Sequence, residues 1–107
     1  MIEIVIPSTL RIGGKDYTVE RNSVLAIRGL EGEHISSQCR LCITDKEDRH
    51  IDDLRATFLH EVVHAIDGIY CGGCDDAMTE VKVNGMAEGL LQFLKELGIR
   101  LIFEGEE

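Results

Sequence analysis

The chain has 107 residues, of which 44% are hydrophobic and 29% are charged. This composition is typical of one small globular domain and argues against disorder or a fibrous repeat. A formal net charge of −9 would repel a phosphate backbone, so we expect no nucleic-acid partner. No secretory leader and no apolar stretch of about 18 residues is found, so we expect a cytoplasmic protein without a membrane partner.

The first part of the chain has the alternation of apolar side chains that is typical of β-strands. Alternating isoleucines predict a strand over residues 2–6. The pair Gly13-Gly14, between two alternating segments, predicts a two-residue hairpin turn. Such a turn sets Leu10 opposite Tyr17 on the inner face.

Farther along the chain, strand patterns give way to helical ones. Residues 22–33 fit either one helical turn or a short strand, whereas alternation over 35–43 predicts a strand. Apolar residues then recur at helical spacing from about Ile51 to a capping Gly68. A second helix is predicted from Asp75 or Asp76 to Leu97, and residues 99–103 form a last strand or a docked extension. These elements predict an α+β fold in a single domain over residues 1–107, with a small antiparallel or mixed sheet followed by two core helices.

The stripe expected to bury the second helix is made of apolar residues at helical spacing. Its members are Val83, Ala87, Leu90, Leu94 and Leu97, supplemented by Met86 and Leu91.

The first helix carries the motif H-E-x-x-H at residues 60–64. His60 and His64 project from the same side of a helix one turn apart, where two imidazole nitrogens can bind one zinc ion. Glu61 lies about a quarter turn around the helix, from where its carboxylate could take a proton from a zinc-activated water. The apolar residues of this helix cover the opposite arc, so one side anchors in the core and the other presents ligands.

A catalytic zinc ion usually has three protein ligands and one open position. A third histidine in the extended H-E-x-x-H pattern is excluded, because the chain has Asp67 and Tyr70 at the decisive positions. The second helix offers Asp76, Glu80 and Glu88. We favour Glu80, because it lies on the buried margin of the apolar stripe, where a carboxylate is costly unless it is paired or bound to metal. Glu88 and Asp76 remain alternatives, although Asp76 also suits a helix N-cap.

The sequence says less about the groups that would surround the metal ligands. Asp67 follows His64 by three residues and could accept the second imidazole N–H, which would fix the tautomer of that ligand. The candidates for stabilising a developing oxyanion are His34, His50 and Tyr70, among which the sequence does not choose.

Residues 57–67 (TFLHEVVHAID) and 80–94 (EVKVNGMAEGLLQFL) resemble the ImmA/IrrE-like zinc metallopeptidases, and most of all the small phage and mobile-element versions with a minimal zincin core. The resemblance implies a gluzincin-type site with His60, His64 and Glu80 on zinc and Glu61 as general base. It also implies that an extended substrate pairs with the strand predicted over residues 35–43. ImmA-type members cleave repressor proteins of mobile elements, which implies a regulatory endopeptidase with a protein or peptide substrate.

Two C-x-x-C pairs, Cys39 with Cys42 and Cys71 with Cys74, suggest a second, structural zinc site. The alternative is that Cys39 fills the core while Cys71 and Cys74 are free thiols in a loop. Regular alternation in a strand favours this alternative, because it places Cys39 and Cys42 on opposite faces.

Two further classes of function compete with a peptidase. One is a non-catalytic, zinc-stabilised zincin-fold module that binds or regulates a partner. An intact Glu61 favours catalysis, because a purely structural zinc site needs only ligands. The other is a redox protein using Cys71 and Cys74, for which the expected βαβ context is missing.

Overall fold

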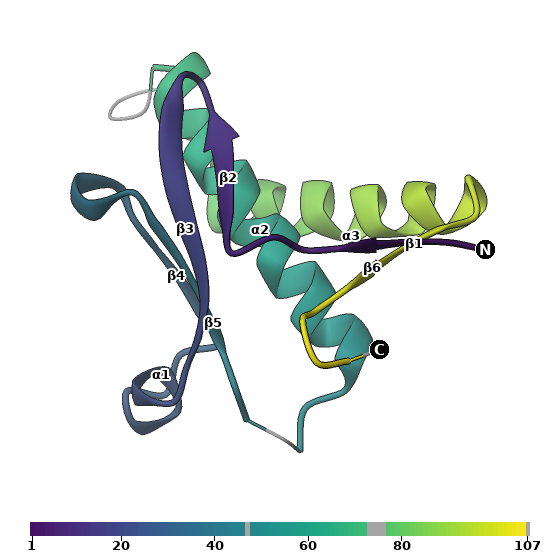
Figure 1. The fold of residues 1–107 in the computed structure, drawn as a ribbon. Coiled ribbons are helices and arrows are strands. Elements are labelled where there is room, and N and C mark those ends of the chain that lie inside the picture. The colour runs from purple at the N-terminus through teal and green to yellow at the C-terminus, as the bar shows by residue number, and fades with distance from the viewer. Residues whose placement is uncertain (47, 73–76, 107) are drawn as a thin grey trace.

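A computed structural model describes residues 1–46, 48–72 and 77–106, and it has the predicted α+β fold (Figure 1). The two long helices are α2 (Ile51–Tyr70) and α3 (Glu80–Glu96), and a single short turn forms α1 (Val24–Ile27). Helix α2 packs against the sheet through β4 and β5 and against α3 on its other side. Within the described residues, no helix is both long and apolar enough to cross a membrane.

The main sheet is mixed and has the strand order β2-β3-β5-β4. Its strands are β2 (Thr9–Ile12), β3 (Lys15–Asn22), β4 (Gly32–Ile35) and β5 (Arg40–Thr44). The pairs β2–β3 and β4–β5 are antiparallel, whereas β3 and β5 run parallel. The order leaves β4 at one edge of the sheet.

The predicted hairpin between β2 and β3 is confirmed. Leu10 pairs with Tyr17, and both turn glycines have positive φ angles, of 59° at Gly13 and 82° at Gly14. A Cβ atom at Gly13 would lie 2.4 Å from Cγ2 of Ile69, so the turn packs directly against the end of α2.

The strand predicted over residues 35–43 is wrong, because the chain reverses within it. A 3-10 turn at Ser36–Gln38 separates β4 from β5, and Cys39 takes the left-handed conformation with φ 51°. The turn occupies only a few residues, so the alternation of side chains continues through it and hides the reversal. The ambiguous segment 22–33 contains both of the structures considered for it, the short helix α1 and the start of β4.

The first and last strands form a separate two-stranded sheet. Strand β1 (Ile2–Val5) pairs in parallel with β6 (Ile99–Ile102), with Ile2 opposite Ile99. The buried Arg55 of α2 holds this pair in place. Its guanidinium donates to the carbonyl oxygen of Leu101 and forms ion pairs with Asp52 and Glu106.

Both helix boundaries next to the interhelical connection differ from the predicted ones. Helix α2 continues through Gly68 to Tyr70, because the glycine with positive φ that follows its C-cap is Gly72. Helix α3 begins at Glu80 with Thr79 as its N-cap, so a start at Asp75 or Asp76 is wrong. Those two aspartates lie outside the described residues.

The core lies between the two long helices, strand β5 and the terminal strand pair. From α3 it takes Val83, Ala87 and Leu91, with Leu94 partly buried at its margin. The rest of the predicted stripe is wrong, because Met86, Leu90 and Leu97 are exposed. The larger cluster of buried residues comprises Ile6, Ile43, Leu54, Ala56, Phe58, Leu59, Ala87, Leu91 and Phe103.

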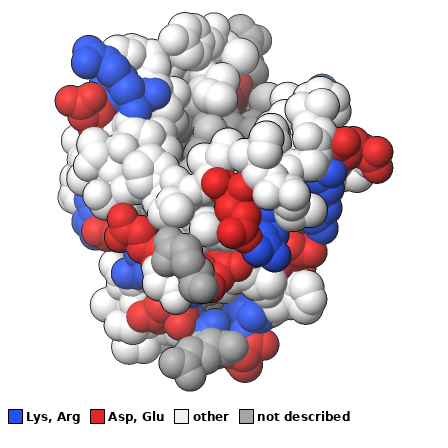
Figure 2. Space-filling model, turned by 45° about the vertical axis from the view of Figure 1, so that its right-hand side comes forward, with Lys and Arg blue, Asp and Glu red and all other residues white. Residues whose placement is uncertain are grey.

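Acidic residues outnumber basic ones, but their charges are not gathered on the face drawn in Figure 2. Red and blue side chains lie next to one another there, and wide areas are uncharged. Among the described ion pairs, Arg28 binds Glu33 at 2.9 Å and Lys95 binds Asp52 at 2.8 Å.

Candidate metal centre

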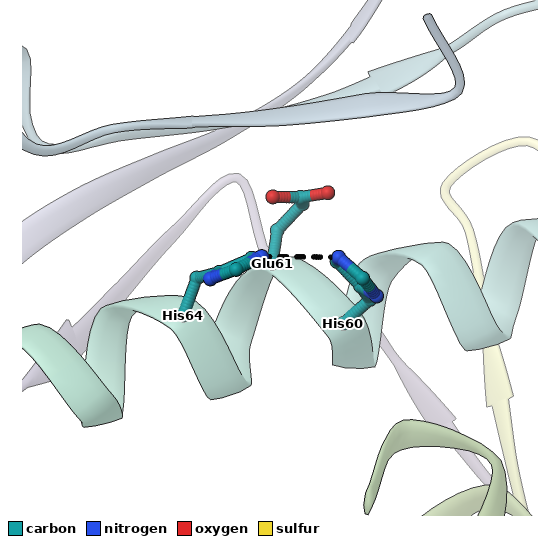
Figure 3. A group of neighbouring side chains, drawn as sticks. All are labelled: His60, Glu61 and His64. Atoms are coloured by element: carbon teal, nitrogen blue, oxygen red, sulfur yellow. Dashed lines mark hydrogen bonds between the residues drawn. The ribbon is translucent and has the colours of Figure 1, made fainter. Parts of the chain in front are cut away.

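Helix α2 places two imidazole rings next to each other. His60 and His64 are one turn apart, and their Nε2 atoms are 3.1 Å apart (Figure 3). The neighbouring Leu59 and Val63 are buried and fix this part of the helix against the core. Both histidine side chains are largely shielded, with exposed fractions of 17% and 25%.

Glu80 of α3 meets both histidines. Its Oε2 atom lies 3.1 Å from Nε2 of His60, and its Oε1 atom lies 2.8 Å from Nε2 of His64. The burial argument that favoured Glu80 is wrong, because its side chain is 68% exposed. It reaches the histidines because it is the first residue of a helix that begins next to them.

These separations are close to those of a tetrahedral zinc site. Metal–ligand distances of about 2.0–2.1 Å place the ligand atoms of such a site about 3.3 Å apart. The two Nε2 atoms are 3.1 Å apart, and each has a Glu80 oxygen at a similar distance, Oε2 at 3.1 Å from His60 and Oε1 at 2.8 Å from His64. Small shifts that bring one of these oxygens between the two rings would accommodate an ion. The residues present therefore fit a metal.

Glu61 lies beside the two histidines and points toward the sheet rather than into the space between the rings (Figure 3). Glu61 is buried, with only 5% of the residue exposed to solvent. Burial raises the pKa of its carboxyl group to about 7, with smaller contributions in the same direction from the negative charges of Glu80 and Glu33. The candidate ligand atoms of His60, Glu61 and His64 lie within 4.8 Å of one another, so this group could hold a metal ion.

A glycine at the start of β4, which the sequence analysis did not single out, lets the edge strand approach Glu61. A Cβ atom at Gly32 would lie 2.9 Å from Oε2 of Glu61 and 2.6 Å from Cγ2 of Thr57. A side chain at position 32 would therefore displace Thr57, the carboxylate of Glu61 or the strand itself. The signal in the sequence is an isolated glycine next to a strand, which often marks a close approach of the backbone.

A cleft of about 390 Å³ opens beside this group. One wall is formed by the start of β4, the second by α2 and the third by α3. Its lining includes Gly32, Thr57, His60, Glu61, Asn84 and Glu88. His60 and Glu61 therefore lie at the surface of a space that a ligand could enter.

We compared the chain with protein-family models, curated proteins and solved structures. None of the three comparisons found a match. The assignment of the site thus depends on the geometry and chemistry of its own side chains.

Of the three residues considered for oxyanion stabilisation, His34 is the one that interacts electrostatically with His64. His34 follows Gly32 by two residues in β4, so its side chain leaves the strand on the face that meets α2. Its Nε2 atom is 3.3 Å from the hydroxyl of Tyr17. Burial lowers the pKa of His34, and interaction with His64 lowers it further. His50 is the N-cap of α2, far along the helix from the site, and Tyr70 is an exposed residue at its other end.

Asp67 has a different partner from the one expected. Its Oδ2 atom accepts a hydrogen bond of 3.0 Å from the backbone N–H of Met78, and no bond to His64 is found between these two described residues. Its Oδ1 atom is buried and has no hydrogen-bond partner among the described residues. The alternative ligand Glu88 lies on the cleft wall, two turns of α3 beyond Glu80, and Asp76 is outside the described residues.

The cysteines contribute no group to the described metal centre. Cys42 is buried in β5 with its Sγ atom 3.2 Å from Oε1 of Glu20. Burial, followed by this hydrogen bond, raises the pKa of the Cys42 thiol to about 11, which disfavours the thiolate that a metal requires. Cys39 is partly buried and Cys71 is exposed, whereas Cys74 lies outside the described residues, so the four-cysteine zinc site stays a prediction.

Proposed function

We propose that this protein is a zinc-dependent metallopeptidase, in which His60, His64 and Glu80 hold the zinc ion. The observation that carries the proposal is the convergence of these three side chains, from two helices, with neighbouring ligand atoms within 3.1 Å. One of the three, His60, lines the cleft together with Glu61. Two imidazoles and one carboxylate are a ligand set of catalytic zinc sites and suit zinc better than a hard cation such as Mg²⁺. Three protein ligands also leave one position open for water or substrate.

Glu61 acts as the general base in this proposal. A zinc ion at the site supplies Lewis acidity, which lowers the pKa of water and polarises a carbonyl group. Glu61 takes one proton from the attacking water while the hydroxyl oxygen bonds to the carbonyl carbon of the substrate. The carbon–nitrogen bond then breaks, and Glu61 returns the proton to the leaving amine. Its buried carboxylate accepts no described hydrogen bond, so it is available for this transfer.

The edge strand β4 supports a peptide as substrate. No other described strand pairs with its outer side, and its first residue lies against Glu61. An extended peptide could add to such an edge and bring one of its carbonyl groups to the cleft. Pairing with the substrate was expected for a strand over residues 35–43; in this proposal β4 alone pairs with it. Together with the resemblance to the ImmA/IrrE-like group, it favours a cytoplasmic regulatory endopeptidase that cleaves a protein substrate.

Elemental analysis and peptide cleavage test the proposal together. We expect about one zinc ion per wild-type chain, its loss in His60→Ala, and its retention in His50→Asn, which removes a histidine but keeps an N-cap residue. A proteome-derived peptide library analysed by mass spectrometry should yield cleavage products with the wild type and none with Glu61→Gln, which should retain zinc.

Two results would refute parts of the proposal. Full zinc content in His60→Ala would show that the metal binds elsewhere than at the histidine pair of α2. A wild type that binds zinc through these residues but cleaves no peptide would favour the non-catalytic zincin-fold module instead.

A further inference from the structure

Glu80 is the ligand whose position depends most on its surroundings. His60 and His64 lie within a 20-residue helix, whereas Glu80 is the first residue of α3 and is 68% exposed. The terminal residues of helices fray more readily than their interiors. The distance from Glu80 to the two histidines therefore depends on what holds the beginning of α3.

Local contacts stabilise α3 but do not by themselves set its beginning against α2. The hydroxyl of Thr79 accepts a 3.3 Å hydrogen bond from the N–H of Lys82, which caps the helix. Val83 is fully buried one turn later and anchors the helix in the core. Neither contact reaches from the segment before Glu80 to the helix that carries the histidines.

The hydrogen bond from the backbone N–H of Met78 to Asp67 does connect the segment before α3 to α2. Asp67 follows His64 by three residues, and so lies about one turn farther along the same side of α2. Met78 precedes Glu80 by two residues, and its N–H lies 3.0 Å from Oδ2 of Asp67. Asp67 is 5% exposed, which shields the bond from water, and its charge faces the N-terminus of α3.

We propose that Asp67 is a positioning residue for the third metal ligand. By holding the N–H of Met78, it fixes the start of α3 so that the carboxylate of Glu80 meets His60 and His64. This inference rests on the proposed zinc site, and it assigns to Asp67 a role in metal affinity without direct contact with the metal. Asn at position 67 can keep the role, because its carbonyl oxygen can accept the same bond while its amide nitrogen takes the place of Oδ1, which has no partner in the described part of the chain.

The test is the zinc affinity of the intact protein, measured by competition with a chromophoric chelator. We expect Asp67→Ala to weaken zinc binding by about 10- to 100-fold, the usual effect of losing a group that supports a ligand. Asp67→Asn should bind zinc nearly as tightly as the wild type.

A double-mutant cycle separates positioning from a general effect on the fold. If Asp67 acts through Glu80, then Asp67→Ala should cause no further loss of affinity in a chain that already carries Glu80→Ala. An equal loss in both backgrounds would overturn the proposal, as would an unchanged affinity in Asp67→Ala. Absence of zinc from the wild type would refute the metal centre itself, whereas zinc that is lost in His60→Ala but not weakened in Asp67→Ala would refute only the role of Asp67.

A second variant covers the case in which Asp67→Ala does not fold. Met78→Pro removes the donor of the same bond, and it lies outside α3, so the proline interrupts no hydrogen bond of the helix. We expect the same loss of zinc affinity, together with faster amide hydrogen exchange in the first turn of metal-free α3. Wild-type affinity in a folded Met78→Pro protein would overturn the proposal.

Discussion

Replacing Glu61 with glutamine should stabilise the metal-free protein, and increasingly so as the pH rises. Burial raises the pKa of the Glu61 carboxyl group from 4.5 to about 7 in the folded protein. The folded state therefore binds this proton more tightly than the unfolded state does. Stability contributed by the protonated group is fully present below pH 4.5 and is lost as the pH rises toward 7.

The size of the effect follows from the pKa difference. A difference of about 2.5 pKa units corresponds to about 3 kcal/mol of unfolding free energy at pH 8, since each unit contributes about 1.4 kcal/mol. Glutamine has nearly the same shape and no charge to desolvate. We therefore expect the unfolding free energy of Glu61→Gln to exceed that of the wild type by about this amount at pH 8, and to match it near pH 4.5.

Urea unfolding in the presence of EDTA, at several pH values between 4.5 and 8, measures this difference. Glu88→Gln is the matched control, because Glu88 lines the same cleft but is exposed to solvent. Its difference from the wild type should stay small at every pH. A difference for Glu61→Gln that does not change with pH, or a variant less stable than the wild type at pH 8, would refute the reasoning.

Three further changes test other parts of the structure. Gly32→Ala should cost about 1–3 kcal/mol in urea unfolding, because the new Cβ would lie 2.9 Å from Oε2 of Glu61, and a neutral result would contradict that close approach. Arg55→Met should cost about 2 kcal/mol by removing the bonds to Leu101 and Glu106, and an unchanged midpoint would show that these bonds add nothing. Zinc at about 100 times its dissociation constant should stabilise the wild type by about 2.7 kcal/mol, and His60→Ala should show no such gain in the same titration.

The parts of the site that were predictable are those set by local geometry. His60, Glu61 and His64 lie on consecutive turns of one helix, so their spacing alone brings two imidazoles together. The contact with Glu80 depends on where a second helix begins, and the reason given for it from the sequence, burial, is wrong. Gly32 and the bond between Asp67 and Met78 depend on contacts between elements, which periodicity does not describe.

In the fold, too, features set by local geometry were predictable and features set by contacts between elements were not. The two glycines of the hairpin determine a local turn, and the register of Leu10 and Tyr17 follows from it. The turn at Ser36–Gln38 contains neither glycine nor proline, and Cys39 takes a left-handed conformation that this residue type rarely adopts, so the reversal gave no sequence signal. The exposed apolar residues of α3 show a further limit of prediction from sequence. A stripe of apolar residues predicts which side of a helix faces the core, but it does not predict how many of those residues the rest of the chain covers.

The parallel pairing of β1 with β6 has a consequence for how the chain folds. Ile2 and Ile99 are opposite each other, so their pairing closes a loop of nearly the whole sequence. Closing a loop of that length is entropically unfavourable and slow compared with forming a hairpin or a helix pair. Ile6, Ile102 and Phe103 are buried only when these terminal segments are in place. Completion of the core therefore waits for the two ends of the chain to meet, which favours a single cooperative folding transition over stepwise assembly.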